Sequence, residues 1–274
     1  MTDSIREYDT IINGITIHCM ERPGAGELTI LFVHGRCMSV RVWEKQFASP
    51  LLRSSRLVAF DLPGHGTSGN AAGSSEYSLE SYRQMLIELI AHCQLTQFFL
   101  VGLSLGGHIV LQALPKLHGC RGVFAMTMPI LKPLEAERMY TRKWLDGRAL
   151  QPNPLPADVD EYVNHMLRFA PDYVPDFLKT DFNRTDPAVH IGLLQTIINE
   201  NYEDELKLIE NNHIPVALAA GVEDQIHELS YLKTLDLPIW RHEPQFVDKA
   251  GHLLPWENPV TINELLASFI EDCA

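Results

Sequence analysis

The sequence predicts an α/β protein in which helices flank a mostly parallel sheet. Apolar runs typical of buried strands alternate with segments of helical periodicity along most of the chain. The chain opens with a hairpin signal, and one long segment interrupts the alternation before it resumes. A length of 274 residues, with 46% apolar and 21% charged residues, suits one large globular domain or two smaller ones.

The first half of the chain accounts for most of the expected sheet. Residues 5–12 and 15–20 predict antiparallel strands, because Asn13-Gly14 between them is typical of a two-residue hairpin turn. Residues 28–33 and 57–60 are short apolar runs that predict buried strands. Ser78 predicts the N-cap of a helix with the apolar face Tyr82, Met85, Leu86, Leu89, Ile90 and Cys93.

The same alternation continues to the C-terminus. A strand at 97–101 leads into a helix at 105–114, and short strands are expected at 123–126, 216–220 and 245–247. A last helix carries one apolar face, formed by Val260, Ile262, Leu265, Leu266, Phe269 and Ile270.

Residues 129–212 break the pattern. They are rich in aromatic residues, prolines and charges, and they contain short helical patterns such as 159–168. We therefore expect a core of residues 1–128 and 213–274, with a helical cap at 129–212. The cap would cover the carboxyl edge of the sheet, where such folds bind ligands.

Composition excludes several classes of partner. A formal charge of −13 argues against binding to nucleic acid or to anionic membranes.

The N-terminus has no signal-peptide pattern, and no apolar run is long enough to span a bilayer. Five scattered cysteines without a C-x-x-C pair predict free thiols and a cytoplasmic setting. The sequence does not predict the oligomeric state.

The segment Gly102-Leu103-Ser104-Leu105-Gly106 follows a predicted strand and opens a predicted helix. This G-x-S-x-G pattern is typical of a nucleophile elbow, in which a sharp turn exposes a serine. A serine hydroxyl needs an imidazole to take its proton. Of twelve histidines, His252 is the candidate by position, on a loop between the strand at 245–247 and the last helix.

A carboxylate is needed to orient that imidazole, and two N–H groups are needed to hold an oxyanion. Gly221-Val222-Glu223-Asp224 follows a predicted strand, and we favour Asp224 over Glu223, with Asp248 as a remoter alternative. The oxyanion donors would be the backbone N–H groups of Leu105 and of Arg36, which follows His34-Gly35. His34 itself is expected to be structural.

In their chain order, these motifs and the stretch from Asp61 to Gly69 resemble the α/β-hydrolase family along essentially the whole chain. The resemblance implies a sheet of about eight strands with the cap inserted after the sixth, and the order Ser104, Asp224, His252 for the catalytic residues. Gly64 to Gly69 also matches G-x-G-x-x-G, but no helix is expected to start there, which argues against a dinucleotide site. A serine at the elbow excludes the epoxide hydrolases and haloalkane dehalogenases of this fold, which use a carboxylate.

The C-terminal third and the segment 158–162 resemble the serine-dependent N-acyl homoserine lactone hydrolases of this fold. That resemblance implies ring-opening hydrolysis of the lactone through an acyl-enzyme, without a metal or cofactor. It implies a substrate contact for Tyr162, and looser candidates for an acyl groove are Met139, Tyr140, Trp144 and Met166. Arg36 departs from the resemblance, because asparagine stands at that position in the lactonase. The alternatives are a carboxylesterase for short acyl or aryl esters and, from another class, a non-hydrolytic receptor or a cofactor-free oxygenase.

Overall fold

The computed structural model describes residues 4–133, 147–169 and 171–274. Its strands form one sheet of eight in the order β1-β2-β4-β3-β5-β6-β7-β8. From β4 to β8 neighbouring strands run parallel, whereas β2 pairs antiparallel with both β1 and β4. The strands are β1 (Arg6–Ile12), β2 (Ile15–Arg22), β3 (Thr29–Val33), β4 (Arg56–Phe60), β5 (Phe98–Leu103), β6 (Cys120–Met126), β7 (Val216–Gly221) and β8 (Gln245–Val247). The predicted α/β class with a mostly parallel sheet is confirmed.

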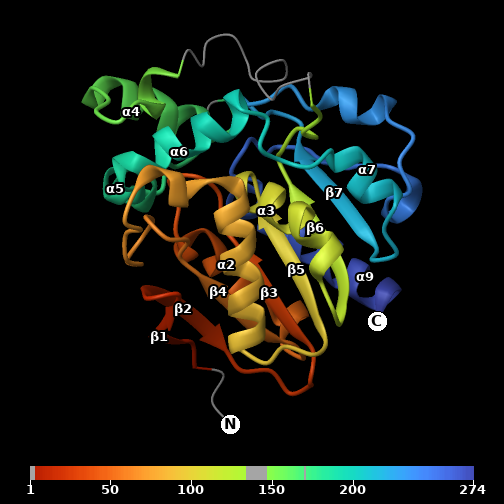
Figure 1. Cartoon of the computed structure of the whole chain (residues 1–274). Coiled ribbons are helices and arrows are strands. Elements are labelled where there is room, and N and C mark those ends of the chain that lie inside the picture. The colour runs from red at the N-terminus through yellow and green to blue at the C-terminus, as the bar shows by residue number, and fades with distance from the viewer. Residues whose placement is uncertain (1–3, 134–146, 170) are drawn as a thin grey trace.

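Helices lie on both faces of this sheet (Figure 1). They are α1 (Glu44–Phe47), α2 (Leu79–His92), α3 (Leu105–Ala113), α4 (Pro156–His165), α5 (Asp176–Arg184), α6 (Pro187–Ile198), α7 (Glu205–Glu210), α8 (Leu254–Glu257) and α9 (Pro259–Cys273). The two local signals in the sequence are confirmed. Asn13 and Gly14 both have positive φ, 52° and 80°, as a type I′ hairpin turn requires, and the Ser78 side chain accepts the N–H of Ser81 at the start of α2.

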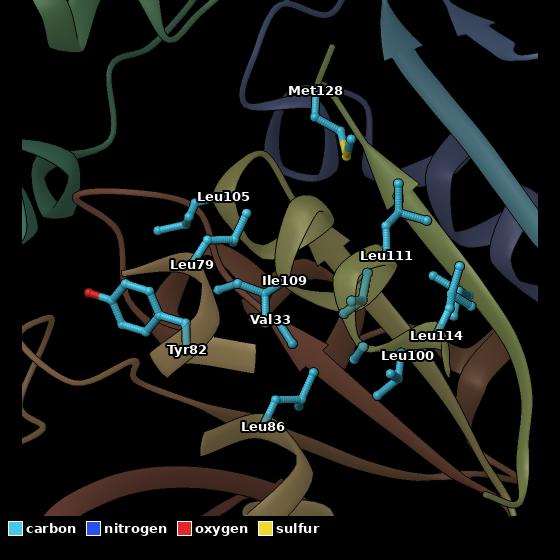
Figure 2. Packing of buried hydrophobic residues seen from close by; sticks show 14 of the residues in the cluster. Val33, Leu79, Tyr82, Leu86, Leu100, Leu105, Ile109, Leu111, Leu114 and Met128 are labelled. Atoms are coloured by element: carbon cyan, nitrogen blue, oxygen red, sulfur yellow. The ribbon is translucent and has the colours of Figure 1, made fainter. Parts of the chain in front are cut away.

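The central strands are buried on both faces, which explains their continuous apolar sequences. In β3, Leu31 and Val33 pack against α2 and α3, while Ile30 and Phe32 belong to the apolar layer on the opposite face. Figure 2 shows the first layer, in which side chains of α2 and α3 meet Val33 and Leu100. The residue after the elbow serine, Leu105, is part of this layer.

The helices α4 to α7 follow β6 in the chain and precede β7, in the segment 129–212 that we expect to form a cap. Figure 1 shows α4, α5 and α6 gathered at the end of the sheet opposite the N-terminus. This is the end at which β5 runs into Ser104 and β6 runs into the cap segment. The division into a core and a cap remains a proposal.

Candidate active site

The turn at Ser104 has the backbone of a nucleophile elbow. Ser104 lies between β5 and α3 with a φ of 52°, a value rare for a residue with a side chain. A Cβ on Gly102 would lie 2.3 Å from the Gly106 carbonyl oxygen, and one on Gly106 would lie 2.1 Å from the Val33 carbonyl oxygen. Both flanking positions therefore require glycine, because the first turn of α3 lies directly against Gly102 of β5 and against the end of β3.

His252 and Asp224 form a buried pair beside this edge of the sheet. Nδ1 of His252 lies 2.9 Å from Oδ2 of Asp224, and the two residues are 1% and 2% exposed. The other oxygen, Oδ1, accepts the backbone N–H groups of Ile226 and His227 at 2.7 and 3.0 Å. Burial alone would raise the pKa of Asp224, but the nearby imidazole of His252 and these hydrogen bonds outweigh it, so the pKa is lowered. The carboxylate stays ionised and holds the imidazole.

The other acid candidates lack this contact. Glu223 is half-buried and its backbone N–H donates to the Ala250 carbonyl at 3.0 Å, while Asp248 is exposed. Of the three acids, Asp224 is therefore the one whose carboxylate contacts His252, and its role as the catalytic acid stays a prediction.

The turn at His34-Gly35-Arg36 packs directly on the elbow. A Cβ on Gly35 would lie 3.2 Å from the Leu103 carbonyl oxygen, and one on Gly106 would lie 2.7 Å from that of His34. Leu105 is the first residue of α3, where a backbone N–H has no acceptor within the helix. His34 is structural, as expected, because Nε2 accepts the Leu62 N–H at 2.9 Å and Nδ1 lies 2.7 Å from the Gly35 carbonyl oxygen.

The segment that matches the dinucleotide pattern is held by Asp61. Its Oδ1 accepts the Val40 N–H at 2.7 Å and its Oδ2 accepts the Thr67 N–H at 2.8 Å. A Cβ on Gly66 would lie 2.0 Å from Oδ2, so glycine there serves this carboxylate. The next α-helix, α2, begins only at Leu79. The loop therefore lacks the helix start that a dinucleotide site needs.

The side chain of Arg36 contacts the cap segment, a contact that sequence reasoning missed. Its Nη2 lies 2.7 Å from Nδ1 of His190, on α6. Arginine can only donate, so Nδ1 of His190 must be an unprotonated acceptor. Burial and the neighbouring Arg36 charge lower the pKa of His190 to about 3. No local pattern links residues 36 and 190, so only the fold reveals this contact.

The contact predicts a specific acid sensitivity. A histidine in the unfolded chain binds a proton near pH 6.5, whereas folded His190 does so only near pH 3. Between these values the unfolded state binds more protons, so the free energy of unfolding falls as the pH is lowered. His190→Gln keeps an acceptor for Arg36 and removes the titration. We expect it to reduce the loss of stability between pH 8 and pH 5 by about 1–2 kcal/mol in urea unfolding.

The same measurement on His242→Gln is the matched control, because His242 is exposed. This variant should lose as much stability between pH 8 and pH 5 as the wild type. An equal loss in His190→Gln would contradict the assignment of a neutral, buried His190.

The segment after α4 touches the loops that carry the buried pair. The Met166 carbonyl accepts the Leu253 N–H at 2.7 Å, and the Leu167 carbonyl accepts Nε2 of Gln225 at 2.8 Å. Glu257 adds a bridge, because its two oxygens accept the N–H groups of Arg168 and Gly251, each at 2.8 Å. Burial raises the pKa of Glu257. These contacts attach residues 166–168 to both sides of His252.

Glu257→Gln tests this bridge. An amide has only one acceptor oxygen, so one of the two N–H groups would face an NH₂ group and lose its hydrogen bond. We expect a loss of about 1–3 kcal/mol in unfolding free energy, measured by urea denaturation. The exposed Glu243→Gln should stay within about 0.5 kcal/mol of the wild type. Equal stability of the two variants would show that Glu257 is dispensable.

The predicted substrate contacts fall into two groups. Met139, Tyr140 and Trp144 lie outside the described residues. Tyr162 is 5% exposed and its ring lies 5.5 Å from that of Phe182, while Met166 is 1% exposed in the same apolar layer. Both pack within the fold, and their contact with substrate stays a prediction.

Within residues 4–133, 147–169 and 171–274, no helix has the length and apolar character needed to cross a membrane. The same part of the chain holds no group of three or more histidine, cysteine or acidic residues arranged to bind a metal.

Comparison with known proteins agrees with this architecture. The chain is 24% identical over 273 residues to a Bacillus subtilis (strain 168) protein named as the uncharacterised hydrolase YugF, covering 95% of this chain and 96% of that one. A solved complex of an N-acyl homoserine lactonase (AidH) variant with N-hexanoyl homoserine superimposes with a TM-score of 0.91 at 23% identity, covering 99% and 98% of the two chains. A proposed aryl esterase from Burkholderia cenocepacia has a TM-score of 0.81 at 22% identity, over 98% and 99%. The family model of the α/β-hydrolase fold matches residues 29–259, and the chain therefore belongs to that family.

Proposed function

We propose that Ser104, His252 and Asp224 form a catalytic triad that hydrolyses a carboxylic ester or lactone through an acyl-enzyme. The observation that carries the proposal is the buried pair of His252 and Asp224 in a chain whose serine occupies a strained turn between β5 and α3. A carboxylate can only accept, so Nδ1–H of His252 donates to Asp224. The lone pair on Nε2 is then free to take a proton from Ser104.

The proposed reaction has two steps. Oγ of Ser104 forms a bond to the carbonyl carbon while His252 takes its proton, and the N–H groups of Leu105 and Arg36 stabilise the oxyanion. The bond to the alkoxide oxygen then breaks, and His252 returns the proton to that oxygen. Water, deprotonated by the same histidine, attacks the acyl-enzyme and releases the acid and Ser104. Neither step calls for a metal or cofactor.

The narrower candidate is ring opening of N-acyl homoserine lactones. Its support is the resemblance of the C-terminal third and of residues 158–162, together with the overlap of nearly the whole chain with a lactonase. In this case the leaving alkoxide stays tethered to the acyl-enzyme, and the acyl chain would lie against cap residues such as Tyr162. A carboxylesterase for open esters is the second candidate. Arg36 counts against the lactone candidate, because it departs from the resemblance, in which asparagine stands at this position.

A matched pair of substrates tests the proposal. N-hexanoyl homoserine lactone and the methyl ester of N-hexanoyl-2-aminobutyrate share the amide and the scissile carbonyl but differ in the ring. Acid release in a pH-stat gives kcat/KM for each. A higher value for the lactone supports the lactonase, and a higher value for the open ester supports the carboxylesterase. No acid release from either, nor from simple alkyl esters, would overturn the hydrolase proposal.

A further inference from the structure

The guanidinium of Arg36 is a cation beside the elbow without a carboxylate partner. No described carboxylate forms an ion pair with it, although the chain carries 35 acidic residues against 22 basic ones. Of its three nitrogens, Nη2 donates to His190 and the buried Nε has no hydrogen-bond partner. No described residue accepts a hydrogen bond from Nη1. Arg36 is only partly buried, so this end of the side chain can meet a ligand.

The carboxylates near Arg36 in the fold each accept hydrogen bonds from other groups. Asp61 holds the backbone of Val40 and Thr67. Asp181, on α5, accepts from Ser39 and Arg41 of the loop that follows Arg36. Asp186, just before α6, accepts the Tyr77 hydroxyl at 2.6 Å and the Ala188 N–H at 2.9 Å. The fold therefore supplies acids around Arg36 and directs each to another partner.

The other titratable groups near Arg36 are neutral. Burial lowers the pKa of His34 and His65 and raises the pKa of the Cys37 thiol to about 11. Burial also raises the pKa of Tyr82. Arg36 therefore has no ion-pair partner among the described residues and keeps hydrogen-bond donors that a ligand can use. A carboxylate from outside the chain would supply the missing partner.

The position of Arg36 indicates which ligand this is. The turn that carries Arg36 packs on the elbow, because a Cβ on Gly35 would lie 3.2 Å from the Leu103 carbonyl oxygen. The side chain of Arg36 reaches His190 on α6, and Figure 1 shows α6 at the end of the sheet opposite the N-terminus. The contact with His190 fixes the direction of the planar donor group. A group bound there would lie on the side of the elbow from which the proposed oxyanion donor, the Arg36 N–H, also comes.

We propose that Arg36 binds a carboxylate on the acyl side of the substrate, so that the preferred substrates are esters of dicarboxylic acids with one free acid group. The inference rests on the proposed ester hydrolysis and specifies its substrate class. Planar guanidinium and carboxylate groups form paired, charge-assisted hydrogen bonds, which a neutral amide on the substrate cannot match.

Monomethyl succinate, glutarate and adipate test the proposal, each against the methyl ester in which an amide replaces the free acid. The readout is the ratio of kcat/KM for the acid to that for the amide, measured in a pH-stat at pH 8. For the best chain length we expect a ratio of about 10–100 in the wild type. Arg36→Gln should lower the ratio by about the same factor, and Arg36→Lys should give an intermediate value, because lysine keeps the charge but not the planar donors.

Arg148→Gln is the matched control, because it changes the net charge equally at a cap arginine that pairs with Asp158 and Glu161. It should leave the ratio of the two kcat/KM values unchanged.

The ratio cancels any general effect of a variant on catalysis, and labelling of Ser104 by a fluorophosphonate verifies that each variant is folded. A wild-type ratio of one or less at every chain length, or an unchanged ratio in Arg36→Gln, would overturn the carboxylate site while ester hydrolysis stands. Failure of the wild type to hydrolyse any of the six esters, while it still hydrolyses the lactone or a simple alkyl ester, would also overturn the carboxylate site alone. Failure on all of these substrates would reject the proposed function, and the inference with it.

Discussion

Ser104→Ala is expected to lower kcat for ester or lactone hydrolysis by about 10⁴- to 10⁶-fold. The hydroxyl is the proposed nucleophile, and alanine removes it while keeping the size of the side chain at the turn. Hydrolysis by the variant should still exceed the uncatalysed rate, because the N–H groups of Leu105 and Arg36 can hold an oxyanion formed by direct attack of water. Steady-state assays measure the loss of kcat. Fluorophosphonate labelling, which needs the serine hydroxyl, should be lost as well.

Ser230→Ala is the control for this prediction, because Ser230 is exposed and donates to Glu228 at the surface. It should keep full activity and full labelling. The thermal melting temperature of Ser104→Ala should be no lower than that of the wild type, so that the loss of activity is not a loss of folding. Labelling of the folded Ser104→Ala protein at the same rate as the wild type would exclude Ser104 as the nucleophile.

Asp224→Asn is expected to lower kcat by about 10³- to 10⁴-fold with little change in KM. Asparagine can still accept the N–H groups of Ile226 and His227 through its oxygen. Its NH₂ group then faces Nδ1 of His252, which must become the acceptor, and the proton moves to Nε2. The imidazole is left in the tautomer that cannot deprotonate Ser104. Steady-state kinetics measure the loss, and a matched melting temperature shows that the fold is kept.

Glu223→Gln and Asp248→Asn are the controls, because the sequence leaves both residues as alternatives. Each should stay within about threefold of wild-type kcat, since within the described part of the chain neither carboxylate contacts His252, and substitutions at such partly or fully exposed positions have small effects. A large loss in Glu223→Gln together with a small one in Asp224→Asn would transfer the role of the acid to Glu223.

Much of the fold follows from local patterns. The strand-like runs, the Asn13-Gly14 turn and the Ser78 cap each reflect an interaction within a few residues, and the structure confirms all of them. The ends of the helices and strands differ from the predicted ends by up to three residues, as at β6, which begins at Cys120 instead of the predicted 123. These ends depend on pairing with neighbouring strands, which a single stretch of sequence does not contain.

In the candidate site, too, one part follows from local sequence and another part does not. The elbow can be predicted from the sequence, because close backbone contacts exclude side chains at Gly102 and Gly106 and so leave a glycine pattern. The choice of acid is less local, since Glu223 and Asp224 are adjacent and equally polar. The loop after β7 separates the two, because Asp224 is buried with Oδ2 2.9 Å from Nδ1 of His252 whereas Glu223 is half-buried without that contact, and we propose Asp224 as the acid on that ground.

The sequence by itself determined the α/β class, which rests on the period of apolar residues, and the elbow, which rests on steric demands within a short turn. The order of the candidate catalytic residues is what the resemblance of the motifs to the α/β-hydrolase family implies. Only the tertiary structure decided that Asp224 holds His252, that residues 166–168 join both sides of that histidine and that Arg36 meets His190 instead of a carboxylate. These contacts join residues 28 to 154 positions apart, and no local pattern encodes which of many polar side chains will meet once the sheet has formed.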